Sequence, residues 1–391
     1  MLLSLALVLI CGIALGGIFQ KLKLPSLLGM LLTGVLLGPF GLDLLDNSIL
    51  AISTDLRQIA LIIILTRAGL NLDIKELRKV GRPAILMCFV PACFEIAGMM
   101  LLAPWLLGIS LLEAAIMGTV VAAVSPAVVV PRMLKLMDNG YGTKKSIPQM
   151  IMAGASVDDV FVIVLFTAFT ELAQGGSISP VRFLTIPTSI ILGLLGGMVT
   201  GFLLSLLFTK IHLRDSIKVI LILSVSFLLV TLEHSMAGVI GFSGLLAVMA
   251  LGATLRQKKP EPSQRLSAKF SKLWVCAEVM LFVLVGATVN MQYARKAGGI
   301  AVLLIFGTLL FRMIGVFACL IQTKLNKRER IFTAFAYIPK ATVQAAIGGL
   351  PLAMGLACGD IVLTVAVLSI LITAPLGVLL IDGTYQKLLK K

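Results

Sequence analysis

Charged residues are scarce in this sequence. Asp, Glu, Lys and Arg make up 13% of its 391 residues, whereas hydrophobic residues make up 59%. A water-soluble domain usually carries about twice that share of charge. The mean hydropathy is +1.07, far above that of a soluble chain. The composition therefore excludes an ordinary soluble fold and predicts an all-α polytopic membrane protein.

The residue types that build most enzymatic and metal sites are also few. The sequence has only two histidines, His212 and His234, and its six cysteines match neither a disulfide framework nor a zinc site in their spacing. We therefore expect a protein that is not an enzyme and has no cofactor. Lys and Arg outnumber Asp and Glu by 33 to 18. The excess follows membrane topology, so we expect lipid and no nucleic acid as a partner.

The apolar residues form about thirteen segments, and we expect each to be a transmembrane helix. The first lacks the basic start and the cleavage site of a signal peptide, so we interpret it as a retained span. Several segments are short or interrupted by Gly and Pro, which is common in transporters. The segments are approximately 2–20, 26–40, 50–70, 83–107, 110–133, 147–172, 184–208, 216–232, 235–255, 271–290, 298–322, 330–352 and 359–382.

Basic residues test this count, because Lys and Arg concentrate in cytoplasmic loops. If the thirteen segments alternate in direction, the loops on the other side hold only Arg182, Arg295 and Lys296. We therefore expect an integral protein of the plasma (inner) membrane, with its N-terminus outside and its C-terminus in the cytoplasm. Nearly all the remaining Lys and Arg residues then fall on the cytoplasmic side, in 21–23, 75–82, 132–145, 210–218, 256–272, 324–330 and 387–391.

The odd number of segments suggests two inverted six-helix repeats joined by a linker helix at 184–208. Glu95 and Arg312 are as far apart in the sequence as Gly69 and Gly286, so both pairs fall in one repeat register. The fifth segment is interrupted at Ser125-Pro126 and the twelfth at Pro339-Lys340. Proline breaks a helix. Breaks in corresponding helices predict a binding site near the middle of the membrane.

Two adjacent carboxylates, Asp158 and Asp159, interrupt the apolar run 147–172. A charge at this depth costs at least a few kcal/mol and usually serves function. Neighbouring helical residues point about 100° apart, so the two carboxylates can hold different partners. One could bind a cation while the other pairs with Lys340. Lys340 would be either a static counter-ion or a proton carrier that gains and loses a proton during the cycle. Carboxylates that accept either a proton or a cation predict coupled exchange, because one site cannot hold both.

Hydroxyl groups near the carboxylates complete a predicted cation site. Ser125, Ser156 and Thr119 would supply neutral oxygens, a set that suits a small hard cation such as Na⁺ or Li⁺. Glu95 and Arg312 are expected to form an intramembrane salt bridge, since an unpaired buried charge is costly. It would serve as a structural clamp or as a gate. Two further charges, Glu278 and Arg67, receive no assigned role.

Four sequence motifs are similar to those of a known family, and the similarity extends over essentially the whole chain. The sequence resembles the cation/proton antiporter superfamily, in particular the NHA-type sodium/proton antiporters. The Asp-Asp and Pro-Lys motifs are specific in combination, although each alone is weak. The motifs are Val124-Ser-Pro-Ala-Val-Val-Val-Pro131, Gly154-Ala-Ser-Val-Asp-Asp159, Ala277-Glu-Val-Met-Leu-Phe-Val-Leu-Val-Gly286 and Pro339-Lys-Ala-Thr-Val-Gln-Ala-Ala346.

The resemblance implies a homodimer that works by an elevator mechanism, with two crossed, broken helices in a mobile core. Residues 1–70 and 216–290 would form the dimerisation domain, and residues 83–172 and 298–382 the core transport domain. Asp159 would be the main carboxylate for cation and proton, and Asp158 would pair with Lys340. Members with Asp-Asp and this lysine tend to be electrogenic. Many bacterial Asp-Asp antiporters have an aspartate where this chain has Ser125, which leaves cation selectivity and stoichiometry open.

Three alternatives stay open at this point. A sodium-coupled organic anion symporter could use a related crossed-helix core, although few polar groups suit an organic substrate. An intramembrane aspartyl protease needs two aspartates from different helices that share a proton. Asp158 and Asp159 instead lie side by side on one predicted helix. An inactive sensor that kept the fold would have little reason to retain both aspartates and Lys340.

Overall fold

A computed structural model describes residues 1–72, 81–174, 180–236, 241–289 and 291–391. These residues form helices joined by turns and loops, and contain no strand. The side chain of Ser156 and most of the basic loop predicted at 75–82 lie outside the described residues. The prediction of an all-α protein is therefore confirmed for the described part of the chain.

The chain divides into two compact units. Unit 1 comprises Met1–Thr54, Lys75–Phe169 and Val279–Lys391, and unit 2 comprises Asp55–Ile74 and Thr170–Glu278. Three helices contribute to both: α4 (Ser53–Asn71), α10 (Ile147–Gln174) and α14 (Pro260–Ala287). The predicted division into dimerisation and transport domains follows different boundaries and stays a prediction.

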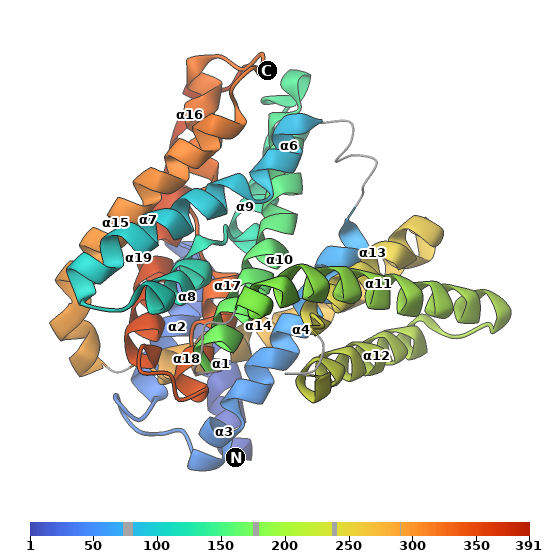
Figure 1. The fold of residues 1–391 in the computed structure, drawn as a ribbon, viewed down its shortest axis with the longest axis horizontal. Helices are drawn as coiled ribbons and strands as arrows, with labels where there is room; N and C mark the ends of the chain where they lie inside the picture. The colour runs from blue at the N-terminus through green and yellow to red at the C-terminus, as the bar shows by residue number, and fades with distance from the viewer. Residues whose placement is uncertain (73–80, 175–179, 237–240, 290) are drawn as a thin grey trace. The chain divides into compact units, whose positions relative to one another are not determined.

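The remaining helices each belong to one unit (Figure 1). Unit 2 holds α11 (Pro180–Lys210), α12 (Asp215–Met236) and α13 (Gly244–Lys258). Unit 1 holds α1 (Leu2–Lys21), α2 (Ser26–Leu37), α3 (Asn47–Ala51), α6 (Arg82–Met87), α7 (Val90–Leu107), α8 (Leu111–Ala122), α9 (Pro126–Asp138), the 3₁₀ turn η1 (Thr143–Lys145), α15 (Met291–Cys319), α16 (Lys327–Ala336), α17 (Thr342–Ile347), α18 (Leu350–Ala353) and α19 (Gly359–Leu388).

Nine helices in the described ranges are long and apolar enough to cross a membrane. They correspond to nine of the thirteen predicted segments. The other four segments, 26–40, 50–70, 235–255 and 330–352, form shorter, interrupted or more charged helices. For example, α2 has only 12 residues. Length and composition thus establish a polytopic membrane protein, while the count of thirteen stays a prediction.

Small residues allow close helix contacts within unit 1. A Cβ atom on Gly34 of α2 would run into the carbonyl oxygen of Val283 in α14. On α7, a Cβ atom on Gly98 would lie 2.6 Å from the Phe311 ring of α15. Close packing through small residues is the usual way in which helices associate in a membrane. The contact between α7 and α15 matters for function, because these helices carry Glu95 and Arg312.

Two helices of unit 1 are interrupted at the predicted prolines. Between α8 and α9 the chain is extended: the backbone angles are φ −71° and ψ 143° at Ala123, and φ −83° and ψ 110° at Ser125. Pro126 then occupies the first turn of α9, where its missing N–H is tolerated. A second non-helical stretch separates α16 from α17 and contains Pro339 and Lys340. Each interruption leaves helix ends inside the protein.

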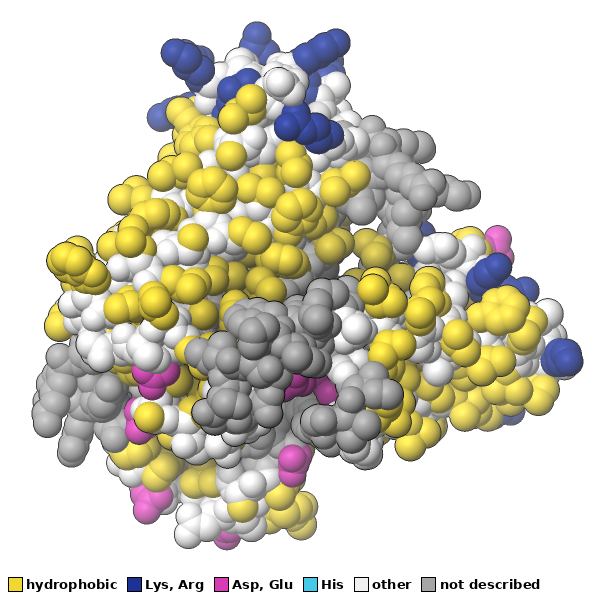
Figure 2. All heavy atoms as spheres, viewed as in Figure 1, with side chains coloured by type: hydrophobic (Ala, Val, Ile, Leu, Met, Phe, Trp, Pro, Cys, Tyr) yellow, Lys and Arg dark blue, Asp and Glu magenta, His cyan; other side chains and the backbone are white. Residues whose placement is uncertain are grey.

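One end of unit 1 is strongly basic. Figure 2 shows Lys and Arg side chains gathered there, with hydrophobic side chains covering the adjoining face. This end carries the start of α16, the start of α10 and the last residues of the chain (Figure 1). These segments all belong to the side of the membrane that is predicted to be cytoplasmic. The exposed basic residues are Lys144, Lys145, Lys324, Lys327, Arg328, Lys387, Lys390 and Lys391.

Candidate functional site

The two interruptions of unit 1 meet directly. The backbone N–H of Ser125 donates a hydrogen bond of 2.8 Å to the carbonyl oxygen of Pro339. Neither group has a partner within its own helix, because each lies in a non-helical stretch. Buried backbone groups need such partners. The contact therefore stabilises both breaks and fixes where the half-helices end.

Arg312 of α15 binds the carboxyl-terminal ends of both interrupted helices. Its Nε donates to the carbonyl oxygen of Tyr337 at 2.7 Å, just beyond α16. Its Nη1 donates to the carbonyl oxygen of Ala122, the last residue of α8. Helix carboxyl ends carry partial negative charge, so a guanidinium group is a suitable partner for them. Arg312 is fully buried and thus joins α8, α15 and α16 from within.

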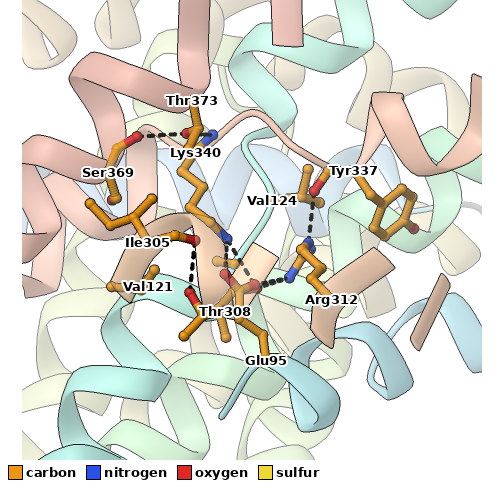
Figure 3. Close-up of polar contacts among 12 residues, drawn as sticks. Glu95, Val121, Val124, Ile305, Thr308, Arg312, Tyr337, Lys340, Ser369 and Thr373 are labelled. Atoms are coloured by element: carbon orange, nitrogen blue, oxygen red, sulfur yellow. Dashed lines mark hydrogen bonds and ion pairs between the residues drawn. The ribbon is translucent and has the colours of Figure 1, made fainter. Parts of the chain in front are cut away.

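The same guanidinium binds two carboxylates, and Figure 3 shows its contact with one of them, Glu95. Arg312 Nη1 lies 2.8 Å from Glu95 Oε2, and Nη2 lies 2.9 Å from Asp158 Oδ2. Lys340 Nζ lies 2.8 Å from Glu95 Oε1. All four side chains are buried. Two cations thus face two anions, which balances the charge of the cluster. Balanced, hydrogen-bonded charges are the form in which buried ions are tolerated.

The structure brings Glu95 and Arg312 together, as the repeat register predicted. It does not form the expected ion pair between Asp158 and Lys340. Lys340 reaches Glu95, whereas Asp158 is held by Arg312 and by the backbone N–H of Val124 at 2.9 Å. The expectation was wrong because Lys340 lies in the break between α16 and α17, and its position depends on how α17 packs. Sequence spacing alone does not determine that packing.

Asp159 differs from the other buried charges. It is buried on α10, yet no ion pair or hydrogen bond to another described residue reaches its side chain within the distances that define these contacts. Its Oδ1 atom is among the buried polar atoms without a partner in the described part of the chain. A buried, unsatisfied polar atom costs about 1–3 kcal/mol and calls for an explanation. A proton or a bound cation would supply the missing partner.

The predicted hydroxyl ligands have different surroundings. Ser125 is buried, and its Oγ has no hydrogen-bond partner in the described residues. Thr119 is also buried, but its Oγ1 donates to the carbonyl oxygen of Ile116 at 2.7 Å, within α8. Its lone pairs remain available. Ser125 is therefore the better candidate for a cation ligand, and the role of Thr119 stays a prediction.

Two further residues of this region were not singled out from the sequence. Gln344 of α17 donates to the carbonyl oxygens of Val121 and Ala123 at the end of α8. Thr373 of α19 accepts the backbone N–H of Lys340 at 3.0 Å. A sequence signal existed for Gln344, because it is the only amide side chain in the apolar run that follows Pro339-Lys340. Thr373 gave no comparable signal.

Arg67 and Glu278, which received no role, both belong to unit 2. They interact electrostatically with each other. This interaction explains how two charges can occupy apolar helices of unit 2. It assigns them no part in the cluster around Asp158.

Interrupted helices whose ends meet inside the protein are a feature of secondary transporters. The nine apolar helices of the described residues make this an integral membrane protein. A family model described as "Sodium/hydrogen exchanger, transmembrane" matches residues 5–384. The chain therefore belongs to the sodium/hydrogen exchanger family.

Curated relatives and a solved structure agree with this assignment. The chain is 35% identical to human sodium/hydrogen exchanger 9B2 over 387 residues, which is 94% of this chain and 70% of the relative. It is 32% identical to human sodium/hydrogen exchanger 9B1 over 385 residues, covering 94% and 73%. The fold is similar to that of the sodium proton antiporter MjNhaP1 from Methanocaldococcus jannaschii, with a TM-score of 0.86 and 21% identity over 99% of this chain and 98% of that one.

Proposed function

We propose that this protein is a secondary-active antiporter that exchanges Na⁺ or Li⁺ for protons across the membrane. One observation carries the proposal: Asp159 is a buried carboxylate that forms no ion pair with any described residue, and it lies next to a cluster whose charges are balanced. Every other carboxylate of the site has a cationic partner. Asp159 is therefore the group whose charge a transported ion would neutralise.

Competition for Asp159 would couple the two ions. A protonated carboxyl group is neutral and does not attract a cation, whereas a bound cation excludes the proton. Na⁺ and Li⁺ are hard cations that prefer oxygen ligands. Asp159 Oδ1, Asp158 Oδ1 and Ser125 Oγ are buried oxygens that have no hydrogen-bond partner in the described part of the chain. Each passage through the membrane would then carry either a proton or a cation. Ser156 of α10 and Thr119 of α8 stay candidate ligands.

The pairing of the charges also bears on stoichiometry. The resemblance implied electrogenic exchange, with Asp158 and Lys340 as a pair that titrates. In the structure Lys340 is held by Glu95 and Asp158 by Arg312. We therefore propose that Asp159 alone changes its occupancy, so that one cation exchanges for one proton. Lys340 would then be a permanent counter-ion.

The finer architecture is proposed on the family resemblance. Thirteen helices would form two inverted repeats whose interrupted helices are α8–α9 and α16–α17. The core transport domain, 83–172 and 298–382, would carry the ion past the dimerisation domain, 1–70 and 216–290, in an elevator-type movement. The protein would be a homodimer with its N-terminus outside and its C-terminus in the cytoplasm. The basic end of unit 1 supports this orientation.

Proton movement in proteoliposomes tests the function. Purified protein is reconstituted with a pH-sensitive dye inside, and Na⁺, Li⁺ or K⁺ is added outside. We expect Na⁺ and Li⁺ to drive proton movement, and Asp159→Asn to abolish it. The matched control is Asp360→Asn, which neutralises an exposed aspartate in the first turn of α19. This control should transport like the wild type.

Two results would contradict the proposal. The first is the absence of proton movement with every cation. The second is movement that survives Asp159→Asn. The stoichiometry is tested separately by imposing a membrane potential with K⁺ and valinomycin. A one-for-one exchange would proceed at the same rate at either sign of potential, whereas an unequal exchange would be accelerated by one sign.

A further inference from the structure

Gln344 joins the two interrupted helices at the site. It lies in the first turn of α17 and is fully buried. Its Nε2 donates to the carbonyl oxygen of Val121 at 3.1 Å and to that of Ala123 at 2.9 Å. Both carbonyl groups belong to the end of α8, where the break leaves them without helical partners. One side chain of the second interrupted helix thus caps the first.

The contact continues through one peptide group to Asp158. The carbonyl oxygen of Ala123 and the N–H of Val124 belong to the same planar peptide unit. Gln344 binds its oxygen, and Asp158 Oδ2 accepts its N–H at 2.9 Å. Hydrogen bonds in such a chain strengthen one another. Gln344 therefore fixes the orientation of the peptide that holds Asp158, and Ser125 is the next residue after that peptide.

The amide of Gln344 can be oriented in only one way. Its Nε2 faces two carbonyl oxygens, so a flipped amide would bring three acceptor oxygens together. This orientation leaves Oε1 buried without a hydrogen-bond partner in the described residues. The Oγ1 atom of Thr342, two residues earlier, is in the same situation. Each of these two buried oxygens can therefore accept a further hydrogen bond at the junction of the two interrupted helices.

We propose that Gln344 is a positioning residue that sets the cation selectivity of the site. By holding the 123–124 peptide it fixes Asp158 and Ser125, and thereby the spacing of the oxygens available to a dehydrated cation. Small cations are distinguished by this spacing, because a smaller ion needs shorter distances to its ligands. The inference rests on the proposed cation exchange. It adds that a residue of the second interrupted helix determines which cation the site prefers.

The inference is tested by measuring cation-driven proton movement in proteoliposomes that contain the Gln344→Met variant. Methionine has nearly the same length and can donate no hydrogen bond. Without the two hydrogen bonds the oxygens around the cation are held less firmly, and we expect the KM for Na⁺ to rise about 10-fold. We also expect the ratio of the KM values for Na⁺ and Li⁺ to change by at least about 3-fold, and kcat to stay within about 2-fold. A purely structural role would lower kcat or the yield and would leave the ratio unchanged.

Gln149→Met is the matched control. Gln149 is half-buried in the first turn of α10, and its Oε1 also lacks a partner in the described residues. The structure records no hydrogen bond between the Gln149 side chain and the interrupted helices. The KM values of this variant should equal those of the wild type. Gln344→Asn serves if the methionine variant does not yield monodisperse protein: its amide is one methylene shorter, and we expect an intermediate rise in KM.

Binding measured without transport separates the two proposals. Na⁺ and Li⁺ that bind the folded protein raise its melting temperature, and the concentration dependence gives Kd. If wild-type protein neither transports nor is stabilised by cations, the proposed function fails. If wild-type protein does both, and Gln344→Met or Gln344→Asn keeps the wild-type KM, Kd and cation ratio, the function stands and the role of Gln344 is refuted.

Discussion

Glu95 is the residue on which the buried charge cluster most depends. Its carboxylate is the only ion-pair partner of Lys340 in the described residues, and it also binds Arg312. Arg312 has a second carboxylate, Asp158. Glu95→Gln therefore leaves Lys340 buried without a negative partner, whereas Arg312 keeps one. Removal of one member of a buried ion pair typically costs about 3–5 kcal/mol.

The reciprocal changes should cost less. Lys340→Met leaves Glu95 paired with Arg312, so we expect the loss of one hydrogen bond to a charged group, about 1.5–3 kcal/mol. Asp158→Asn leaves Arg312 paired with Glu95, and its amide oxygen can still accept the N–H of Val124. The double variant Glu95→Gln/Lys340→Met removes both partners. It should recover much of the stability lost in Glu95→Gln, because neutral replacements of a whole pair are often tolerated.

Thermal unfolding in detergent, followed by size-exclusion chromatography, measures these differences. At about 2 °C per kcal/mol for a large domain, Glu95→Gln should lower the melting temperature by ~6–10 °C. Lys340→Met should lower it by about half as much or less. A double variant as unstable as Glu95→Gln would refute the reasoning. So would a Lys340→Met variant that is less stable than Glu95→Gln, because Glu95 would then not be the partner on which Lys340 depends.

The remaining predictions concern the junction of the helices and the free carboxylate. Gly377→Ala should slow transport at least about 10-fold, because the added methyl group would run into the Pro339 ring. Gly383→Ala, on the same helix, is the control: its methyl group would have no neighbour within 4 Å, so this variant should be neutral in the same flux assay. Asp159→Asn should raise the melting temperature by at least ~2 °C, since it removes a buried carboxylate that has no ion-pair partner among the described residues. The variant should also lose all stabilisation by Na⁺. A fall in its melting temperature would contradict the role of Asp159 as the cation-binding carboxylate. Where proton and cation compete for Asp159, the KM for Na⁺ should rise up to about 10-fold for each unit that the pH falls, and a KM independent of pH would exclude competition.

The breaks themselves were predictable from the sequence. Ser125-Pro126 and Pro339-Lys340 interrupt apolar runs, and proline ends a helix through local chemistry alone. Glu95 and Arg312 could be placed together because the two halves of the chain share a register, and the structure has them 2.8 Å apart. The Asp158-Asp159 pair was visible for a similar reason: charge in an apolar helix is rare enough to attract attention.

Which charge binds which partner could not be predicted in this way. Lys340 lies within a helix break, so the direction of its side chain depends on the packing of α17 and α19, where Thr373 accepts its backbone N–H. The same packing places Gln344 against the end of α8. The contacts of Gln344 join residues that are more than 200 positions apart, and the contact of Lys340 with Thr373 joins residues 33 positions apart. No local pattern specifies either.

The sequence by itself thus determined the class of protein, the two helix breaks and the set of buried charges. These follow from hydropathy, proline chemistry and the cost of charge at membrane depth. Only the tertiary structure decided that Glu95 pairs with Lys340, that Arg312 pairs with Asp158, and that Asp159 has no ion-pair partner among the described residues. The physical reason is that an ion pair depends on distances of a few ångströms between side chains. Those distances are set by the packing of helices from distant parts of the chain.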